Sequence, residues 1–141
     1  MAGDFGGNPG FGGSALPGGT ERILVVDDEF MVREVAKDLL EELGYTVVAV
    51  TDGGSALDIL RETREPFDLV VLDMVMPGMN GLETLTAIRD SWPEQKVFLV
   101  SGYDSDDKIQ QALQMDNVEF LQKPYKISDM AMMVRQFLDR T

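Results

Sequence analysis

Short apolar runs alternate with helix-length amphipathic segments along most of this chain, and this alternation restricts the fold more than any other feature. The runs at residues 23–26, 69–72 and 97–100 contain only aliphatic or aromatic residues, as in strands that are covered on both faces. The segments between the runs place apolar residues at helical spacing. Five such strand–helix units, joined by short links, predict right-handed crossovers and an α/β sandwich of three layers.

The same pattern predicts where the elements lie. Strands are expected at residues 22–27, 45–50, 67–73, 96–101 and 118–121. A helix is expected after each strand, the first at residues 30–43 and the last at residues 127–139. Asp52 is expected to cap the second helix. Val35 and Leu113 are expected to face the core, whereas Met132 lies outside the apolar stripe of its helix and is expected to face outwards.

Glycine is concentrated at the amino-terminal end of the chain. Eight of the 14 glycines lie in residues 1–20, together with Pro9 and Pro17. Such a segment buries too little apolar surface to order itself. We therefore predict a flexible arm or linker at residues 1–20 and one domain at residues 21–141. Residues 1–20 also lack the basic and apolar regions of a secretory signal.

The composition argues against several classes of function. The chain has no cysteine and no histidine, which rules out thiol chemistry, disulfides and a Ser-His-Asp triad. The formal net charge of -13 argues against direct binding to nucleic acid or to anionic membranes. No apolar stretch approaches the ~20 residues that span a bilayer. We therefore expect no membrane segment and a cytoplasmic location.

Acidic, hydroxyl and basic side chains stand at the ends of the predicted strands. Asp27 and Asp28 follow the first strand, Asp73 and Ser101 end the third and fourth, and Lys123 follows the fifth. Because the carboxyl ends of parallel strands meet at one edge of a sheet, we expect these side chains to lie together. Crowded carboxylates repel one another unless a cation lies between them, and oxygen ligands favour Mg²⁺ or Ca²⁺. Taken alone, the two adjacent acids also allow a plainer role as helix caps.

Four motifs at these strand ends resemble those of a known family. The motifs at residues 25–29, 72–78, 100–102 and 123–125 are similar, in sequence and in order, to those of the receiver domain of bacterial two-component response regulators. The resemblance covers residues 21–140. It implies a flavodoxin-like fold, which is a three-layer α/β sandwich with a five-stranded parallel sheet in the order 2-1-3-4-5 and five helices.

The resemblance also implies a role for each residue at the strand ends. Asp73 would be the phosphoacceptor. Asp27, Asp28 and Asp73, together with the backbone carbonyl of Val75, would hold Mg²⁺. Lys123 would pair with an oxygen of the phosphoryl group.

Further residues would form the switch and the contacts with partner proteins. Ser101 would hydrogen-bond the phosphoryl group and would change state together with Phe120. The peptide bond between Lys123 and Pro124 is expected to be cis. The downstream target would bind the face formed by the fourth helix, the fifth strand and the fifth helix. Three residues around the mouth of the site would contact the phosphoryl donor: Phe30, Met31 and Tyr125.

The function that the resemblance implies is a phosphorylation-dependent signalling switch. A histidine kinase or a histidine phosphotransfer protein would donate the phosphoryl group, and the domain would catalyse only its own phosphorylation and dephosphorylation. The chain would be a stand-alone receiver or the terminal receiver of a hybrid histidine kinase. One alternative is an aspartate-nucleophile phosphatase of the haloacid-dehalogenase type, which needs a second acid where Val75 stands. Another is a flavodoxin-like cofactor-binding module, whose phosphate site Asp27 and Asp28 would disfavour.

Overall fold

The sheet consists of five parallel strands. The computed structural model describes residues 16–76, 78–102 and 107–140. The strands are β2 (Arg22–Val26), β3 (Thr46–Val50), β4 (Leu69–Asp73), β5 (Val97–Ser101) and β6 (Val118–Gln122). They lie side by side in the order β3-β2-β4-β5-β6, and every neighbouring pair is parallel. In chain order this is 2-1-3-4-5, which confirms the predicted topology.

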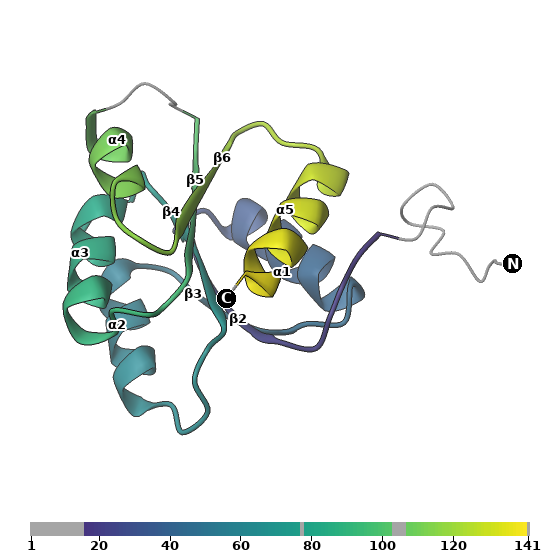
Figure 1. The fold of residues 1–141 in the computed structure, drawn as a ribbon, viewed down its shortest axis with the longest axis horizontal. Coiled ribbons are helices and arrows are strands. Elements are labelled where there is room, and N and C mark those ends of the chain that lie inside the picture. The colour runs from purple at the N-terminus through teal and green to yellow at the C-terminus, as the bar shows by residue number, and fades with distance from the viewer. Residues whose placement is uncertain (1–15, 77, 103–106, 141) are drawn as a thin grey trace, which may run out of the picture.

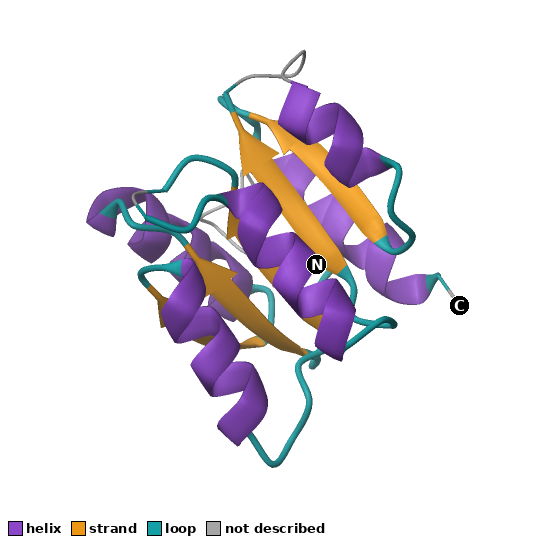
Figure 2. Ribbon diagram, turned by 90° about the vertical axis from the view of Figure 1, so that its left-hand side faces the viewer, coloured by secondary structure: helices purple, strands orange, loops and turns teal. Residues whose placement is uncertain are grey.

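Four helices connect the strands, a fifth follows the last strand, and together they cover both faces of the sheet (Figures 1 and 2). They are α1 (Phe30–Glu42), α2 (Gly53–Glu62), α3 (Gly81–Ser91), α4 (Asp107–Leu113) and α5 (Ile127–Asp139). α1 and α5 pack on one face, where Leu40 and Phe137 are buried. α2, α3 and α4 pack on the other face, where Leu85 and Ile109 are buried. The three predicted layers are therefore present.

Burial along the central strands explains their sequence pattern. All five residues of β4 and all five of β5 are buried. Since both faces of these strands contact helices, neither face favours polar residues, and apolar residues follow one another without alternation. The last residue of β4 is Asp73 and the last residue of β5 is Ser101, and both are buried polar residues. These polar residues thus lie at the border between the core and the edge of the sheet.

Side-chain caps fix where two helices begin. Asp52 accepts a hydrogen bond from the backbone N–H of Ser55 at 2.8 Å, so the predicted cap of α2 is confirmed. Asn80 accepts one from the N–H of Glu83 at 2.9 Å, and the Glu83 carboxylate accepts one from the N–H of Asn80 at 2.9 Å. This reciprocal capping box starts α3 a few residues after Asp73. It therefore helps to fix the course of the loop beside the end of β4.

Two residues that were expected in the core are exposed. Val35 in α1 is 56% exposed and Leu113 at the end of α4 is 39% exposed, so the prediction was wrong for both. Val35 lies at the margin of the apolar stripe of α1, whose buried residues are Ala36, Leu39 and Leu40. Leu113 is the last residue of a seven-residue helix. Met132 is 48% exposed, as predicted.

Part of the predicted amino-terminal arm contacts the domain. The backbone N–H of Gly19 donates a hydrogen bond to the carbonyl of Leu43 at 3.1 Å. Arg135 of α5 donates one to the carbonyl of Gly18 at 3.1 Å. Gly18 and Gly19 are therefore tied to α5 and to the end of α1, which the composition did not predict. Residues 1–15, where the rest of the predicted arm lies, are outside the described residues.

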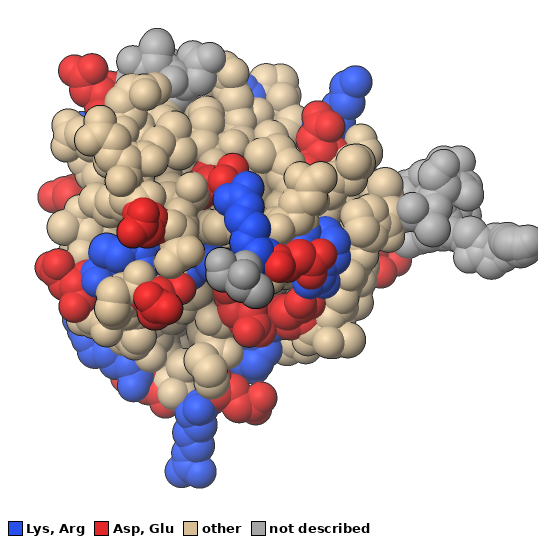
Figure 3. All heavy atoms as spheres, viewed as in Figure 1, with Lys and Arg blue, Asp and Glu red and all other residues tan. Residues whose placement is uncertain are grey.

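Charged side chains of both signs are spread over the surface. On the face seen in Figure 3, basic side chains alternate with acidic ones, and no continuous basic area is visible there. Within the described part of the chain, no helix has the length and apolar character needed to cross a membrane.

Candidate functional site

Five side chains from four strand ends meet at the carboxyl edge of the sheet. Asp27 and Asp28 directly follow β2, Asp73 ends β4, Ser101 ends β5, and Lys123 follows β6. The strand order places β4 between β2 and β5. Asp73 therefore lies between the acidic pair and the hydroxyl, as the sequence predicts.

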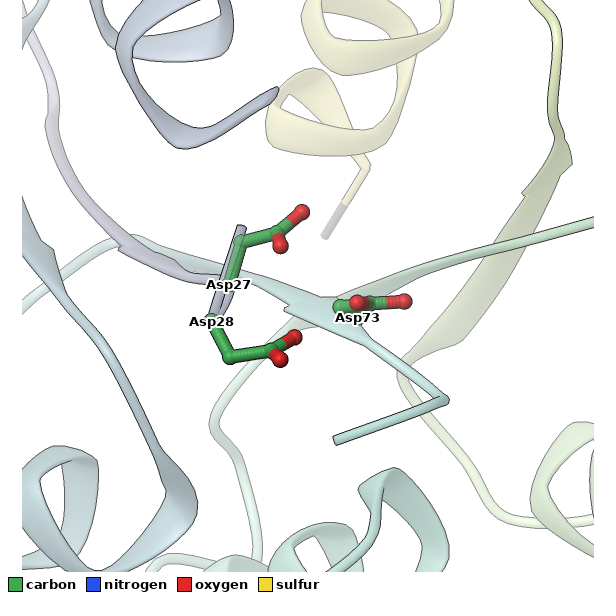
Figure 4. Close-up of side chains that lie close together, drawn as sticks. All are labelled: Asp27, Asp28 and Asp73. Carbon is green, nitrogen blue, oxygen red and sulfur yellow. The ribbon is translucent and has the colours of Figure 1, made fainter. Parts of the chain in front are cut away.

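The three acids form one cluster. Asp27, Asp28 and Asp73 each offer a carboxylate oxygen, and these oxygens lie within 4.8 Å of one another. Figure 4 shows the three carboxyl groups pointing to the same side of the strand ends. Asp27 and Asp73 are buried, whereas Asp28 is exposed. Two of these acids are therefore shielded from water, and the third borders the solvent.

A single ammonium group bridges the two buried acids. Lys123 Nζ lies 3.7 Å from Asp27 Oδ2 and 3.7 Å from Asp73 Oδ1. Backbone groups make further contacts: the N–H of Val75 donates to Asp73 Oδ1 at 3.3 Å, and the N–H of Glu29 donates to Asp27 Oδ1 at 2.9 Å. These contacts orient both carboxylates, but one ammonium cannot neutralise three acids.

The environment of Asp73 favours its protonated form. The pKa of Asp73 is raised to about 6, mainly by burial; the negative charges of Asp27 and Asp28 contribute to the rise, while Lys123 and the hydrogen bond from the Val75 N–H oppose it. The largest cause is the loss of water around the carboxylate. A bound cation would counter this effect, because it attracts the ionised form.

The cluster fits a hard divalent cation. Its ligands are carboxylate oxygens, which Mg²⁺ and Ca²⁺ prefer over softer metals. Three ionised carboxylates and Lys123 leave a charge of about -2 (-3 + 1) at the site. A divalent ion would balance that charge.

Arg33 is a contributor that sequence reasoning missed. Its guanidinium donates a hydrogen bond to the backbone carbonyl of Asp27 at 3.0 Å and lies 5.4 Å from the ring centroid of Phe30. The backbone N–H of Lys123 donates to the carbonyl of Ser101 at 2.7 Å. The two hydrogen bonds hold the loops that carry the site. The sequence offers one hint of this role: Arg33 is a basic residue in the first turn of α1, close behind the acidic pair.

The other predicted residues lie at the start of α1, in β6 and in the loop after β6. Phe30 is 63% exposed and Met31 is 71% exposed at the start of α1. Tyr125 is half-buried, and burial raises the pKa of its hydroxyl, with the charge of Asp27 adding to the effect. Phe120 in β6 is partly buried against the core on the α4 side.

Two of the predicted motifs contain a proline. The Lys123–Pro124 peptide bond is cis, as expected. Pro77, which belongs to the motif at residues 72–78, lies outside the described residues.

The position two residues after Asp73 separates the alternative functions. Val75 is 60% exposed and carries no acidic group. A haloacid-dehalogenase-type phosphatase needs a general acid at this position. The turn after β2, where a flavodoxin-like module would bind phosphate, contains Asp27 and Asp28 instead. Neither alternative therefore has the residues that it needs.

Comparison with known proteins agrees with this geometry. The family model described as "Response regulator receiver domain" matches residues 23–135. The chain belongs to the response regulator receiver domain family. As a receiver domain it acts in two-component signalling, where it accepts a phosphoryl group, and it is not a classical enzyme. Receiver domains generally interact with histidine kinases or phosphotransfer proteins.

Similar proteins include both short and long chains. The receiver domain is 32% identical over 118 residues to sporulation initiation phosphotransferase F of Bacillus subtilis (strain 168), covering 84% of this chain and 94% of that protein. It is 36% identical over 123 residues to the sensor kinase CckA of Brucella abortus (strain 2308), covering 86% of this chain but only 13% of the kinase.

A similar solved structure is a CheY-like response regulator receiver domain protein from Methanospirillum hungatei JF-1. It has a TM-score of 0.79 and 29% identity, with 86% of this chain and 95% of that chain covered. The likeness therefore extends over nearly the whole of a protein that consists of a receiver domain.

Proposed function

We propose that Asp73 is the phosphoacceptor of this receiver domain. One observation carries the assignment: Asp73 is the acid of the cluster that ends the central strand β4, where it is buried and lies 3.7 Å from Lys123 Nζ. Asp27 also contacts Lys123, but its other oxygen accepts the Glu29 backbone N–H. Asp28 is exposed and forms no ion pair with the residues that the structure describes. Asp73 thus combines burial, a cationic partner and a central place on the sheet.

The proposed reaction is a direct phosphoryl transfer. A carboxylate oxygen of Asp73 forms a bond to phosphorus, while the phosphorus–nitrogen bond to the donor's histidine breaks. The electron pair of that bond returns to the imidazole, which leaves as the neutral donor side chain after taking up a proton. Catalysis of this step relies on position and on charge neutralisation more than on covalent chemistry by the protein.

Mg²⁺ is the proposed cofactor. Asp27, Asp28 and Asp73 would hold it, together with the backbone carbonyl of Val75. The oxygen-only donors and the uncompensated negative charge support this choice. When bound, the ion neutralises the charge of the phosphoryl oxygens. Lys123 would remain beside Asp73 and pair with another of those oxygens.

Phosphorylation would then shift the conformation of the domain. Ser101, at the end of β5, would donate a hydrogen bond to the phosphoryl group, and Phe120 would change rotamer with it. Phe120 lies directly beside Leu99 in the next strand and packs against the core under α4. The proposed readout face is therefore α4, β6 and α5. A difference of a few kcal/mol in partner affinity between two states is enough for such a switch.

The proposal extends to partners and context. The donor is a histidine kinase or a histidine phosphotransfer protein that docks near Phe30, Met31 and Tyr125, and the domain acts in the cytoplasm. Similarity to a short phosphotransferase and to part of a sensor kinase supports both a stand-alone receiver and a receiver within a hybrid kinase. In either case the domain's own catalysis is limited to its phosphorylation and dephosphorylation.

Mass spectrometry tests the assignment of Asp73. The protein is incubated with acetyl phosphate and Mg²⁺, in parallel with Asp73→Asn and with Asp28→Asn. We expect a mass gain of one phosphoryl group in the wild type and none in Asp73→Asn. Asp28→Asn is expected to react slowly but at the same residue. EDTA is expected to abolish the gain. A phosphoryl group on Asp73→Asn, or one located at another residue of the wild type, would refute the assignment.

A further inference from the structure

A cavity opens next to the proposed phosphoryl position. It has a volume of about 300 Å³, which is within the range that admits a small ligand. Ser101 and Val75 contribute to its lining from the ends of β5 and β4, and Lys108 contributes from the first turn of α4. Because Ser101 and Val75 both belong to the proposed site, a small phosphodonor in this cavity would lie beside Asp73.

The lining contains one cation among the described residues, and it is Lys108. Met74, Met76 and Ile109 supply apolar surface. Asn80 also contributes, but its side-chain oxygen accepts the Glu83 N–H in the cap of α3. Lys108 therefore brings positive charge to the lining of this cavity, next to the acidic Asp107 in the first turn of α4.

A charge count shows why a second ammonium matters. Three carboxylates are balanced by Lys123 and a divalent ion (-3 + 1 + 2 = 0). Phosphorylation replaces the single charge of the Asp73 carboxylate by the ~-2 charge of an acyl phosphate. A dianionic donor brings a similar charge before the reaction. Lys123 lies between Asp27 and Asp73, so its charge is already shared by two acids.

We propose that Lys108 is a specificity-determining residue for the phosphorylation of Asp73, and that it favours small phosphodonors with two negative charges. This inference rests on the proposed function. In the reaction, an Asp73 oxygen forms a bond to phosphorus, the bond from phosphorus to the leaving group breaks, and the leaving group keeps the electron pair. Lys108 attracts the donor and the phosphoryl oxygens by its charge, and it neither gives nor takes a proton.

Two donors of different charge test this role. Phosphorylation is followed at pH 7 and low ionic strength with acetyl phosphate, which is a dianion, and with phosphoramidate, which is mainly a monoanion. The variants are Lys108→Gln, which removes the charge, and Lys108→Arg, which keeps it. Lys37→Gln is the control, since Lys37 lies in α1 and pairs with Glu41 at 3.1 Å, on the other face of the sheet.

We expect Lys108→Gln to lower the second-order rate constant with acetyl phosphate about three- to tenfold, because an exposed charge steers ligands moderately. The loss with phosphoramidate should be clearly smaller. At 0.5 M salt, the loss caused by Lys108→Gln should shrink with both donors, because salt screens the charge. Lys108→Arg should restore the wild-type rate, and Lys37→Gln should not change it.

The outcomes separate this inference from the proposed function. Equal losses with the two donors would assign Lys108 a structural role and overturn the inference, as would a wild-type rate for Lys108→Gln. Neither result affects Asp73 as the phosphoacceptor. If the wild type gains no phosphoryl group from either donor, or if Asp73→Asn gains one, the proposed function fails instead.

Discussion

The site places one carboxylate under two opposing demands. Asp73 must be ionised to attack phosphorus, yet it is 4% exposed and lies among other acids. Burial accordingly raises its pKa to about 6 from an ordinary value of 3.8. The folded domain therefore tolerates the ionised form poorly when no cation is bound, and the residue that reacts is also one that opposes folding.

This conflict predicts a pH-dependent effect of Asp73→Asn on stability. An acid whose pKa is higher in the folded state destabilises the fold when ionised. The penalty is complete above pH ~6, shrinks as the pH falls towards the unfolded value, and is absent below pH ~4. In EDTA, Asp73→Asn should therefore be more stable than the wild type by about 1–3 kcal/mol at pH 8 and equally stable near pH 4.

Urea unfolding in EDTA at several pH values measures this difference. Adding Mg²⁺ at pH 8 should reduce the advantage of Asp73→Asn, because the ion stabilises the wild type through its carboxylate. A stability difference that stays constant between pH 8 and pH 4 would contradict the assigned burial penalty.

At the scale of elements, α1 contributes an exposed apolar ridge beside the site. Phe30 and Met31 are 63% and 71% exposed, and Val35, one turn after Met31, is 56% exposed. Side chains four residues apart lie next to each other on a helix. The ridge borders the loop that carries Asp27 and Asp28. A donor protein that presents a phosphorylated histidine would cover this surface while it reaches Asp73.

We expect Phe30→Ala and Met31→Ala to slow transfer from a phosphorylated histidine donor by about tenfold, which is typical for an apolar anchor in an interface. Reaction with acetyl phosphate should not change, because the small donor does not need the ridge. Leu113→Ala is the matched control, since Leu113 is exposed to 39% but lies at the end of α4. Equal effects on both donors would indicate damage to the site itself.

Several elements could be predicted because their signals are local. The apolar runs of β4 and β5 reflect burial on both faces, and α5 begins and ends where its pattern predicts. The site residues could be predicted as a group because a parallel sheet brings the ends of its strands together. Val35 was misplaced because a helical stripe has a broad margin, and the periodicity does not say which side of that margin contacts the sheet. Arg33 was missed because its partner is a backbone carbonyl, and its place in the first turn of α1 does not by itself indicate such a contact.

At the scale of the whole molecule, the glycines of the amino-terminal segment have two opposite effects: they make a chain flexible, and they also allow it to pack closely. The abundance of glycine indicates flexibility, and that rule led to the prediction of an arm up to residue 20. A Cβ atom on Gly18 would overlap the carbonyl of Leu43, and one on Gly19 would overlap the guanidinium of Arg135. The absence of side chains thus permits close packing of residues 18 and 19 on the domain, a contact that composition cannot reveal.

Arg135 joins this segment to α5, and its loss should weaken the whole domain. The guanidinium donates to both carboxylate oxygens of Glu21, to Asp139 and to the Gly18 carbonyl, and its hydrogen bond lowers the pKa of Glu21. We expect Arg135→Met to lower the free energy of unfolding by about 1–3 kcal/mol, as for charge-assisted hydrogen bonds that are partly shielded from water. Because the pKa of Glu21 is lowered in the folded state, this contribution should be present above its ordinary pKa and decline as the pH falls below it.

Urea unfolding at pH 7, together with hydrogen exchange of the Gly19 amide, tests this coupling. That amide donates to the Leu43 carbonyl, so its protection should fall in Arg135→Met if Arg135 holds residues 18 and 19 in place. Arg61→Met serves as the control, because the pair of Arg61 with Asp58 is 59% and 69% exposed and should contribute less than about 0.5 kcal/mol. If Arg135→Met were no less stable than Arg61→Met and kept the Gly19 amide protected, the segment would be held by its backbone contacts alone. The amino-terminal boundary of the folded domain would then be set by the close packing of Gly18 and Gly19 on the domain, and not by the ion pair of Arg135 with Glu21.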